Sequence, residues 1–438
     1  MRPFGLPQAI AWCAFFTVCM GPFLFGAVER SVWIPLCQLW IGLGLASTWA
    51  GSRGGPGDRP SSGLAVSRAL LPLHALFALQ LIPMPAFLLR VLSPASFAAH
   101  FLPDPGDGRF RPLTVSPGST VEAWLYVAGL QGLFLALQGI PVEKRRAFLG
   151  AMVAVILILA GEGLWQSRSP HPFWFYGRVP TYSPQGLEEG IFGPYYNRNH
   201  FATVVAMGAG LAAGLAASIT RERGGFARML SDAVRVPKVV LLAGAAAMLV
   251  VSSAASGSRS GALAAVAAMT LIAARSFGTR LLLVGFGVGA LFLAISGAAA
   301  IERLSRLDVT ASRWQPWMDM TGLVRFFPVF GSGAGTFAVA YFPHQTFSTY
   351  EFWRYAHNDY LQWVIEGGLL GVLALFVALR SLRRSVHWDA DAGEGGLGAA
   401  FAFGTQALFD FPCRIPANAG ILVGILALTV ALRPRSRN

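Results

Sequence analysis

The sequence predicts an all-α, polytopic membrane protein with about 12 transmembrane helices and a long outer loop before the tenth. Of the 438 residues, 54% are hydrophobic and 13% are charged, whereas a soluble domain usually has about 25% charged residues. The hydrophobic residues are gathered in separate blocks, many of them near the roughly 20 residues that a bilayer requires. These observations exclude a water-soluble multidomain enzyme. We therefore treat residues 1–438 as a single integral membrane domain.

Twelve apolar blocks define the expected helices. They span residues 8–28, 32–50, 64–90, 121–139, 147–165, 199–219, 239–256, 261–274, 281–300, 357–379, 396–411 and 418–432. The first block has no small-residue cleavage site after it, so we interpret it as a retained span rather than a signal peptide. The blocks at 261–274 and 396–411 are short for a full crossing, and whether they cross completely stays open.

The distribution of basic residues predicts the orientation of these helices. With both termini in the cytoplasm, the short inner segments contain 19 Lys and Arg residues, and the longer outer segments contain 13. Basic residues concentrate in cytoplasmic loops of membrane proteins, so this orientation is favoured. The net charge of +13 is explained in the same way, and we expect membrane lipids rather than nucleic acid as partners.

Three outer segments are longer than turns: residues 91–120, 166–198 and 301–356. Long loops in a compact protein usually carry function or are disordered, and the last two are rich in aromatic residues and arginine. Within the third loop, Ile301, Leu304 and Leu307 have helical spacing, which predicts a short helix at the membrane surface. The chain has no G-x-x-x-x-G-K-[ST] motif, so we do not expect ATP-driven transport by this chain alone.

Several arginines lie on the outer side against the overall charge bias. Arg259 is the clearest, because the run SSAASGSRSGALAAV has no other charge. A guanidinium at a helix mouth is costly unless it has an anionic partner or extends to the lipid headgroups. Together with Arg178 and Arg198 it could bind a lipid-linked phosphate or diphosphate through bidentate contacts. Contacts to anionic lipids are the alternative.

The densest polar group is RYAHNDYLQWVIEGGLLG, residues 354–371. His357 is the strongest candidate for a general base, since an imidazole can accept a hydroxyl proton near neutral pH. Asn358 and Asp359 could cap the following helix. Asp359 and Glu366 are seven residues apart and therefore lie on nearly the same helix face. Glu366 lies within the apolar block, where it is either functional or a buried carboxyl group paired with an arginine.

Two other histidines lie in polar outer surroundings. His344, in YFPHQTF, is a second candidate base. His200 follows Asn197, Arg198 and Asn199 at a helix start, where capping by asparagine is the alternative role. No group of His, Cys, Asp and Glu has metal-ligand spacing, and the four cysteines form no CxxC pair. We therefore expect no metal and no disulfide framework.

Three stretches together resemble the bacterial O-antigen ligase/polymerase superfamily. They are GPYYNRNHFATVVAM (193–207), SGSRSGALAAV (256–266) and GSGAGTFAVAYFP with RYAHNDYLQWVIEGGLLG (331–371). Their order and their positions relative to the spans match over a region of residues 145–430. The third stretch is the most specific of the three.

The resemblance implies a GT-C-type membrane glycosyltransferase of the bacterial inner membrane. Such proteins move a glycan from undecaprenyl diphosphate to an acceptor hydroxyl, such as one on lipid A-core, at the periplasmic face. They need neither a nucleotide nor a metal, so no cofactor is expected. The resemblance also implies that periplasmic arginines hold the diphosphate and that a histidine lies near the acceptor.

The family's functional positions can be transferred to this chain residue by residue. Arg259 matches one arginine, although a serine intervenes before the following glycine, and His357 matches the H-[NS]-x-x-L pattern with Leu361 in place. The second arginine is Arg178 or Arg198. We favour Arg178, because Arg198 is part of the asparagine-rich helix start. The predicted catalytic residues are His357, Arg259 and Arg178, and the predicted substrate-binding residues are Arg198, Asn199, His344, Asn358, Asp359 and Glu366.

Four functions compete at this stage. The first is a ligase that transfers a finished glycan to lipid A-core, and the second is a Wzy-type polymerase that joins lipid-linked repeat units. A protein O-oligosaccharyltransferase is disfavoured, because no soluble C-terminal extension is present. A secondary transporter would use Glu162, Glu366 and Asp410 as ion-coupling residues, but these are scattered and the chain shows no internal repeat.

Overall fold

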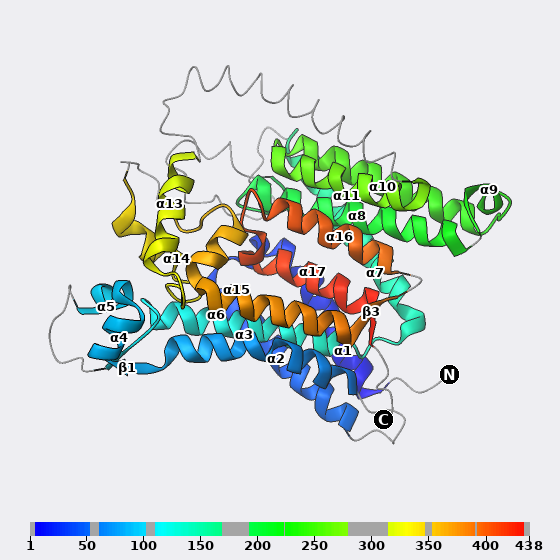
Figure 1. Ribbon diagram of the computed structural model, residues 1–438. Coiled ribbons are helices and arrows are strands. Elements are labelled where there is room, and N and C mark those ends of the chain that lie inside the picture. The colour runs from blue at the N-terminus through cyan, green and yellow to red at the C-terminus, as the bar shows by residue number, and fades with distance from the viewer. Residues whose placement is uncertain are drawn as a thin grey trace, which may run out of the picture.

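The computed structural model describes residues 5–52, 61–101, 110–168, 192–222, 224–278, 314–346, 353–389 and 392–432. These residues are mostly helical, and the long helices lie side by side (Figure 1). The strands in the described ranges are short and form two small two-stranded sheets. The expected class, an all-α multi-pass membrane protein, agrees with this architecture.

Eight helical segments in the described ranges are long and apolar enough to cross a membrane. They are Leu6–Phe23 (α1 with the following 3₁₀ turn), α2 (Arg30–Ser52), α6 (Pro117–Leu137), α7 (Val142–Gln166), α8 (Arg198–Glu222), α10 (Arg235–Ala255), α11 (Arg259–Phe277) and α15 (Asp359–Ser385). With 19 residues, α11 extends the short block at 261–274 to a sufficient length.

The expected count of about 12 is not reached within these ranges. The block at 281–300 lies outside the described residues. Helices α16 (Gly393–Gln406) and α17 (Pro416–Thr429) have 14 residues each, and in α3 (Ser61–Leu81) the apolar part covers Ala65–Leu81. These three helices are therefore too short, or not apolar over a sufficient length, to count among the eight candidate membrane spans.

The single block expected at 64–90 is wrong in its second half. Helix α3 ends at Leu81, and the chain then forms β1 (Pro83–Pro85), which pairs with β2 (Phe110–Pro112). Two prolines in three residues remove two backbone donors and favour extended backbone before each ring, so the helix cannot continue. The rest of the block lies in the short helix α4 (Ala86–Leu92), and a second short helix, α5 (Pro94–Phe101), follows it.

Helix α8 forms the centre of the bundle. Of its most apolar 18-residue window, 94% is buried, and it packs against α10, α11 and α16. Gly210 lies against the backbone of Gly398, and Gly214 lies against the backbone of Glu394 and Gly395. Because a side chain at these glycines would meet backbone atoms, the sequence allows α8 and α16 to approach closely.

The bundle has two distinct ends. At one end, which we call the site end, helices α2, α6, α8, α11, α15 and α17 begin, and α13 (Trp314–Phe326) and α14 (Phe337–Tyr341) lie over it (Figure 1). At the opposite end, Glu394 forms ion pairs with Arg221 at 2.9 Å and with Arg275 at 2.8 Å. This end also carries α9 (Phe226–Met229) and the pair of β3 (Val386–Trp388) with β4 (Val430–Leu432).

Candidate functional site

A pocket of about 820 Å³ opens at the site end. Segments that are far apart in the sequence build its walls: residues 25–33, the first turns of α6, the start of α8, residues 354–362 and the turn before α17. Its lining includes Glu29, Arg30, Trp33, Glu122, Tyr126, Tyr196, His200, Arg354, Tyr355, Phe411 and Arg414. The pocket thus combines aromatic rings with both signs of charge, which is typical of a site for a polar organic ligand.

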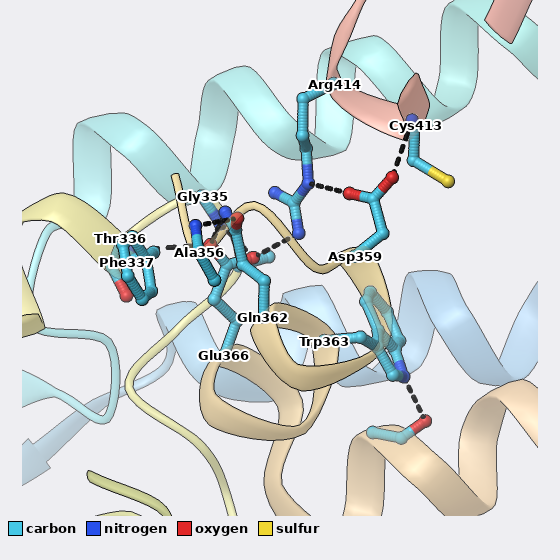
Figure 2. Close-up of polar contacts among 12 residues, drawn as sticks. Gly335, Thr336, Phe337, Ala356, Asp359, Gln362, Trp363, Glu366, Cys413 and Arg414 are labelled. Atoms are coloured by element: carbon cyan, nitrogen blue, oxygen red, sulfur yellow. Dashed lines mark hydrogen bonds and ion pairs between the residues drawn. The ribbon is translucent and has the colours of Figure 1, made fainter. Parts of the chain in front are cut away.

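Glu366 is the centre of a polar network beneath this pocket. Its side chain is 1% exposed and accepts hydrogen bonds from the Gly335 amide at 3.0 Å, the Phe337 amide at 3.3 Å and the Gln362 side chain at 2.9 Å. Arg414 Nη2 lies 2.8 Å from the same carboxylate (Figure 2). A buried carboxylate needs such partners, because an unpaired charge in this environment is very costly.

Arg414 connects Glu366 to Asp359. Its Nε lies 3.7 Å from the Asp359 carboxylate, which also accepts a hydrogen bond from the Cys413 amide at 2.8 Å (Figure 2). Burial alone would lower the pKa of Arg414, but the carboxylates of Glu366 and Asp359 outweigh it and raise the pKa. Arg414 is therefore permanently charged, and its side chain, which lines the pocket, is 17% exposed.

Three glycines allow the segment before α14, residues 331–335, to lie close to this network. Gly331, Gly333 and Gly335 have φ values of 71°, 109° and 74°, a region that side chains rarely tolerate. The amide of Gly333 donates to the Glu366 carbonyl at 3.1 Å, and Gln80 of α3 donates to the same carbonyl at 2.9 Å. The glycine segment, α3 and α15 are thus joined by hydrogen bonds at the Glu366 carbonyl.

His357 lies just before α15 with a left-handed backbone, φ 51°. Its Nδ1 is 3.2 Å from the carboxylate of Asp410, which is fully buried, and its ring packs edge-on against Phe411 and Trp353. His200 Nε2 lies 3.8 Å from the other oxygen of Asp410. The carboxylate and the two aromatic contacts fix the orientation of the His357 imidazole.

Two predicted arginines lie together at the site end. Arg259 is the first residue of α11 and is exposed; Ser258, its N-cap, accepts a hydrogen bond from the Gly261 amide at 3.2 Å. Arg198 is exposed at the start of α8, and its guanidinium lies beside Gly257, two residues before Arg259. Neither arginine forms an ion pair with a carboxylate of the described residues.

The comparison with known families can now be added to this geometry. Residues 242–376 match the model of the O-antigen ligase family. The resemblance to the O-antigen ligase superfamily is thereby supported, and this part of the chain is similar to membrane enzymes of O-antigen biosynthesis. No curated protein matches the chain. The O-antigen ligase region contains Arg259, His344, His357 and Glu366, but it excludes Arg198 and the segment from Asp410 to Arg414.

The remaining predicted residues have the following positions. Asn358 is the N-cap of α15 and accepts a hydrogen bond from the Leu361 amide at 3.0 Å. Asn199 lies in the first turn of α8. His344 bonds through Nδ1 to the Ala340 carbonyl at 3.0 Å and packs on Phe326, and it does not line the pocket. Arg178 lies outside the described residues, as does the helix expected around residues 301–307.

Sequence reasoning missed Arg414 as a site residue. The signal was present: the expected spans at 396–411 and 418–432 put Arg414 in a short outer connection, where basic residues are disfavoured. The pocket residues at 25–33 were also missed, because the early spans contain no motif of the family.

Within the described ranges, no group of three or more His, Cys, Asp and Glu side chains could hold a metal ion.

Proposed function

We propose that the protein is a metal-independent, inverting glycosyltransferase. It moves a glycan from undecaprenyl diphosphate to an acceptor hydroxyl, that of lipid A-core, at the periplasmic face of the inner membrane. One observation carries the proposal: Arg259 and His357, both within the O-antigen ligase region, lie at the same end of the bundle, with Arg198 beside Gly257, two residues before Arg259. An anion-binding pair and an oriented base are the two elements that this reaction requires.

The arginines supply the electrostatic part of the reaction. Negative charge develops on the diphosphate as the bond to the anomeric carbon breaks, and donors aimed at that charge stabilise the transition state. Arg198 and Arg259 are exposed and lie at neighbouring helix starts. A guanidinium binds two phosphate oxygens at once and keeps its charge at any relevant pH. Arg178 would add a third cation on the outer loop.

His357 supplies the proton transfer. Its Nδ1 faces Asp410, so Nε2 is the nitrogen that can accept the acceptor's proton. The acceptor oxygen forms a bond to the anomeric carbon on the face opposite the diphosphate, and the bond from that carbon to the diphosphate oxygen breaks. The proton ends on His357 and the electron pair on the diphosphate, which inverts the anomeric configuration.

The proposed reaction is tested with two substitutions that remove one component each. We expect Arg259→Ala and His357→Ala to lower transfer of glycan from extracted lipid-linked donor by about 10²-fold or more, because each removes a group used in the transition state. The control is Arg380→Ala, at the opposite end of α15, where the side chain is exposed. Unchanged transfer in both site variants, with folded and inserted protein, would contradict the enzyme proposal.

A polymerase of O-antigen or exopolysaccharide repeats is the second candidate. It is favoured by the same residues, because its donor and leaving group are the same. Surface glycans of a deletion strain, separated on gels beside extracted lipid-linked glycans, distinguish the two functions. Bare lipid A-core with long polymer left on undecaprenyl diphosphate identifies a ligase. Core capped with a single repeat, or single repeats left on the lipid, identifies a polymerase.

A further inference from the structure

One wall of the pocket is made by residues outside the O-antigen ligase region. They are residues 25–33, the first turns of α6 and Tyr196, and they share the pocket with Arg354, Phe411 and Arg414. We call this wall the N-terminal wall.

The backbone of this wall is held in an unusual conformation. Phe25, Gly26 and Ala27 have successive φ values of 56°, 73° and 56°. For Phe and Ala this region costs about 1–2 kcal/mol per residue, and such strain persists where surrounding contacts impose it, often at ligand sites. Here Gly26 lies against the ring of Tyr195, which leaves no space for a side chain. The turn therefore holds Phe25 and Glu29 in fixed positions at the pocket.

The wall presents aromatic rings in fixed orientations. Phe25 stacks on Tyr196 with ring centroids 4.8 Å apart and planes inclined by 6°. Trp33 contacts Tyr126 edge-on at 6.1 Å, and the Tyr126 hydroxyl donates to the Cys413 carbonyl at 3.0 Å. Trp33, Tyr126 and Tyr196 are partly exposed and line the pocket. Ring faces of this kind bind apolar C–H faces of a ligand.

Two carboxylates, those of Glu29 and Glu122, lie among these aromatic rings in the pocket lining. Glu29 accepts a hydrogen bond from the Tyr196 hydroxyl at 2.8 Å. Glu122 pairs with Arg30 at 2.7 Å, and their side chains are 33% and 71% exposed. Each carboxylate oxygen has more than one lone pair, so a carboxylate that already has a partner can accept a further hydrogen bond from a neighbouring hydroxyl. A ligand with both apolar C–H faces and adjacent hydroxyl groups satisfies the rings and the carboxylates together, and a pyranose sugar has this combination.

We propose that the N-terminal wall is a saccharide-binding subsite for a pyranose with adjacent free hydroxyls. This inference rests on the proposed function for the origin of the sugar, which is either the donor glycan or the acceptor. Phe411 also lines the pocket, and its ring contacts the ring of His357 with centroids 4.8 Å apart. A sugar seated on the N-terminal wall therefore occupies the same pocket as a residue that contacts the proposed base.

Direct binding tests the subsite independently of transfer. The full-length protein in lipid nanodiscs is titrated with two oligosaccharides released by mild acid from the producing strain, one from its surface polysaccharide and one from its lipid A-core. The variants are Trp33→Ala and Glu122→Gln. Their matched controls are Trp49→Ala at the other end of α2 and Glu143→Gln at the start of α7, both exposed and outside the pocket.

We expect wild type to bind at least one of the two oligosaccharides, and Trp33→Ala and Glu122→Gln to weaken that binding about tenfold. The controls should bind as wild type does. Binding of the polysaccharide fragment assigns the subsite to the donor glycan, and binding of the core fragment assigns it to the acceptor. His357→Ala should bind normally while its transfer is lost, which separates the subsite from the proposed reaction.

The inference is overturned if wild type binds neither oligosaccharide, or if the two wall variants bind as well as their controls. Each variant is first shown by thermal unfolding to be folded like wild type, so that a loss of binding reports on the subsite. If wild type instead binds only added anionic lipid, and the wall variants lose that binding, the wall is a lipid site and the saccharide proposal fails. Glycan transfer measured in parallel reports separately on the proposed function.

Discussion

At the residue scale, Arg414 shows how one cation organises two acidic groups. Asp359 and Glu366 lie two helical turns apart on α15, and Arg414 reaches both from the turn before α17. The two carboxylates are 7% and 1% exposed. Removing one partner from a buried ion pair leaves an uncompensated buried charge, which lowers the folding stability by more than the loss of the attraction alone.

We therefore expect Arg414→Ala to lower the free energy of unfolding by about 3–5 kcal/mol. The comparison variant is Arg235→Ala, which removes ion pairs with Glu222 at 3.1 Å and Asp232 at 3.6 Å. The Arg235 side chain is 32% exposed, and a solvent-accessible pair contributes at most about 1 kcal/mol. Denaturant unfolding in detergent measures both. A loss for Arg414→Ala no larger than that for Arg235→Ala would show that the pair is not a major source of stability.

The same residues show what sequence reasoning can and cannot reach. The seven-residue spacing placed Asp359 and Glu366 on one helix face, because that follows from the geometry of a single helix. It left open whether Glu366 is functional or paired with an arginine. Their partner was not identified, since Arg414 is 48 residues from Glu366 in the chain and only the packing of α15 against the α17 turn brings them together.

At the element scale, the glycine segment before α14 determines how closely the outer loop approaches α15. A Cβ atom at Gly331 would collide with the backbone of Glu366 and Gly367. In addition, φ of 71° is a conformation that alanine adopts with strain. The segment therefore cannot accept a side chain without moving away from the helix.

We expect Gly331→Ala to destabilise the protein by about 1–3 kcal/mol. Gly322, in α13, is the matched control, because a Cβ there meets nothing within 4 Å and its φ is not positive. Gly322→Ala should be neutral or stabilising by up to about 1 kcal/mol, as helix propensity favours alanine. Thermal unfolding followed by tryptophan fluorescence measures both. Equal stability of the two variants would contradict the close approach.

Helix ends were the least predictable elements. The hydrophobic blocks located the long helices, because a bilayer selects for length and apolarity. The break after Leu81 was missed, although Pro83 and Pro85 were visible, since hydropathy averaged over a window does not register backbone donors. The start of α15 was expected at residue 357, and the structure begins it at Asp359 with Asn358 as the cap.

At the scale of the whole molecule, arginines lie at both ends of the bundle, and two of those at the site end differ from the pair beside Glu394 at the opposite end. At the opposite end, Arg221 and Arg275 are paired with Glu394, whereas Arg198 and Arg259 at the site end have no carboxylate partner among the described residues. The inner segments also have the higher density of basic residues, which predicts that the opposite end lies in the cytoplasm. The proposed reaction requires the site end to face the periplasm.

Single cysteines test this orientation directly. In a variant with Cys13 and Cys413 replaced by serine, Gly118→Cys marks the site end and Ser231→Cys marks the opposite end, and both positions are exposed. A membrane-impermeant maleimide, added to cells with a permeabilised outer membrane, should label Gly118→Cys before lysis and Ser231→Cys only after lysis. The reverse pattern would place Arg259 and His357 in the cytoplasm. That result would contradict both the predicted orientation and the proposed reaction. The donor glycan is on the periplasmic face, and the arginines would then lie on the cytoplasmic face.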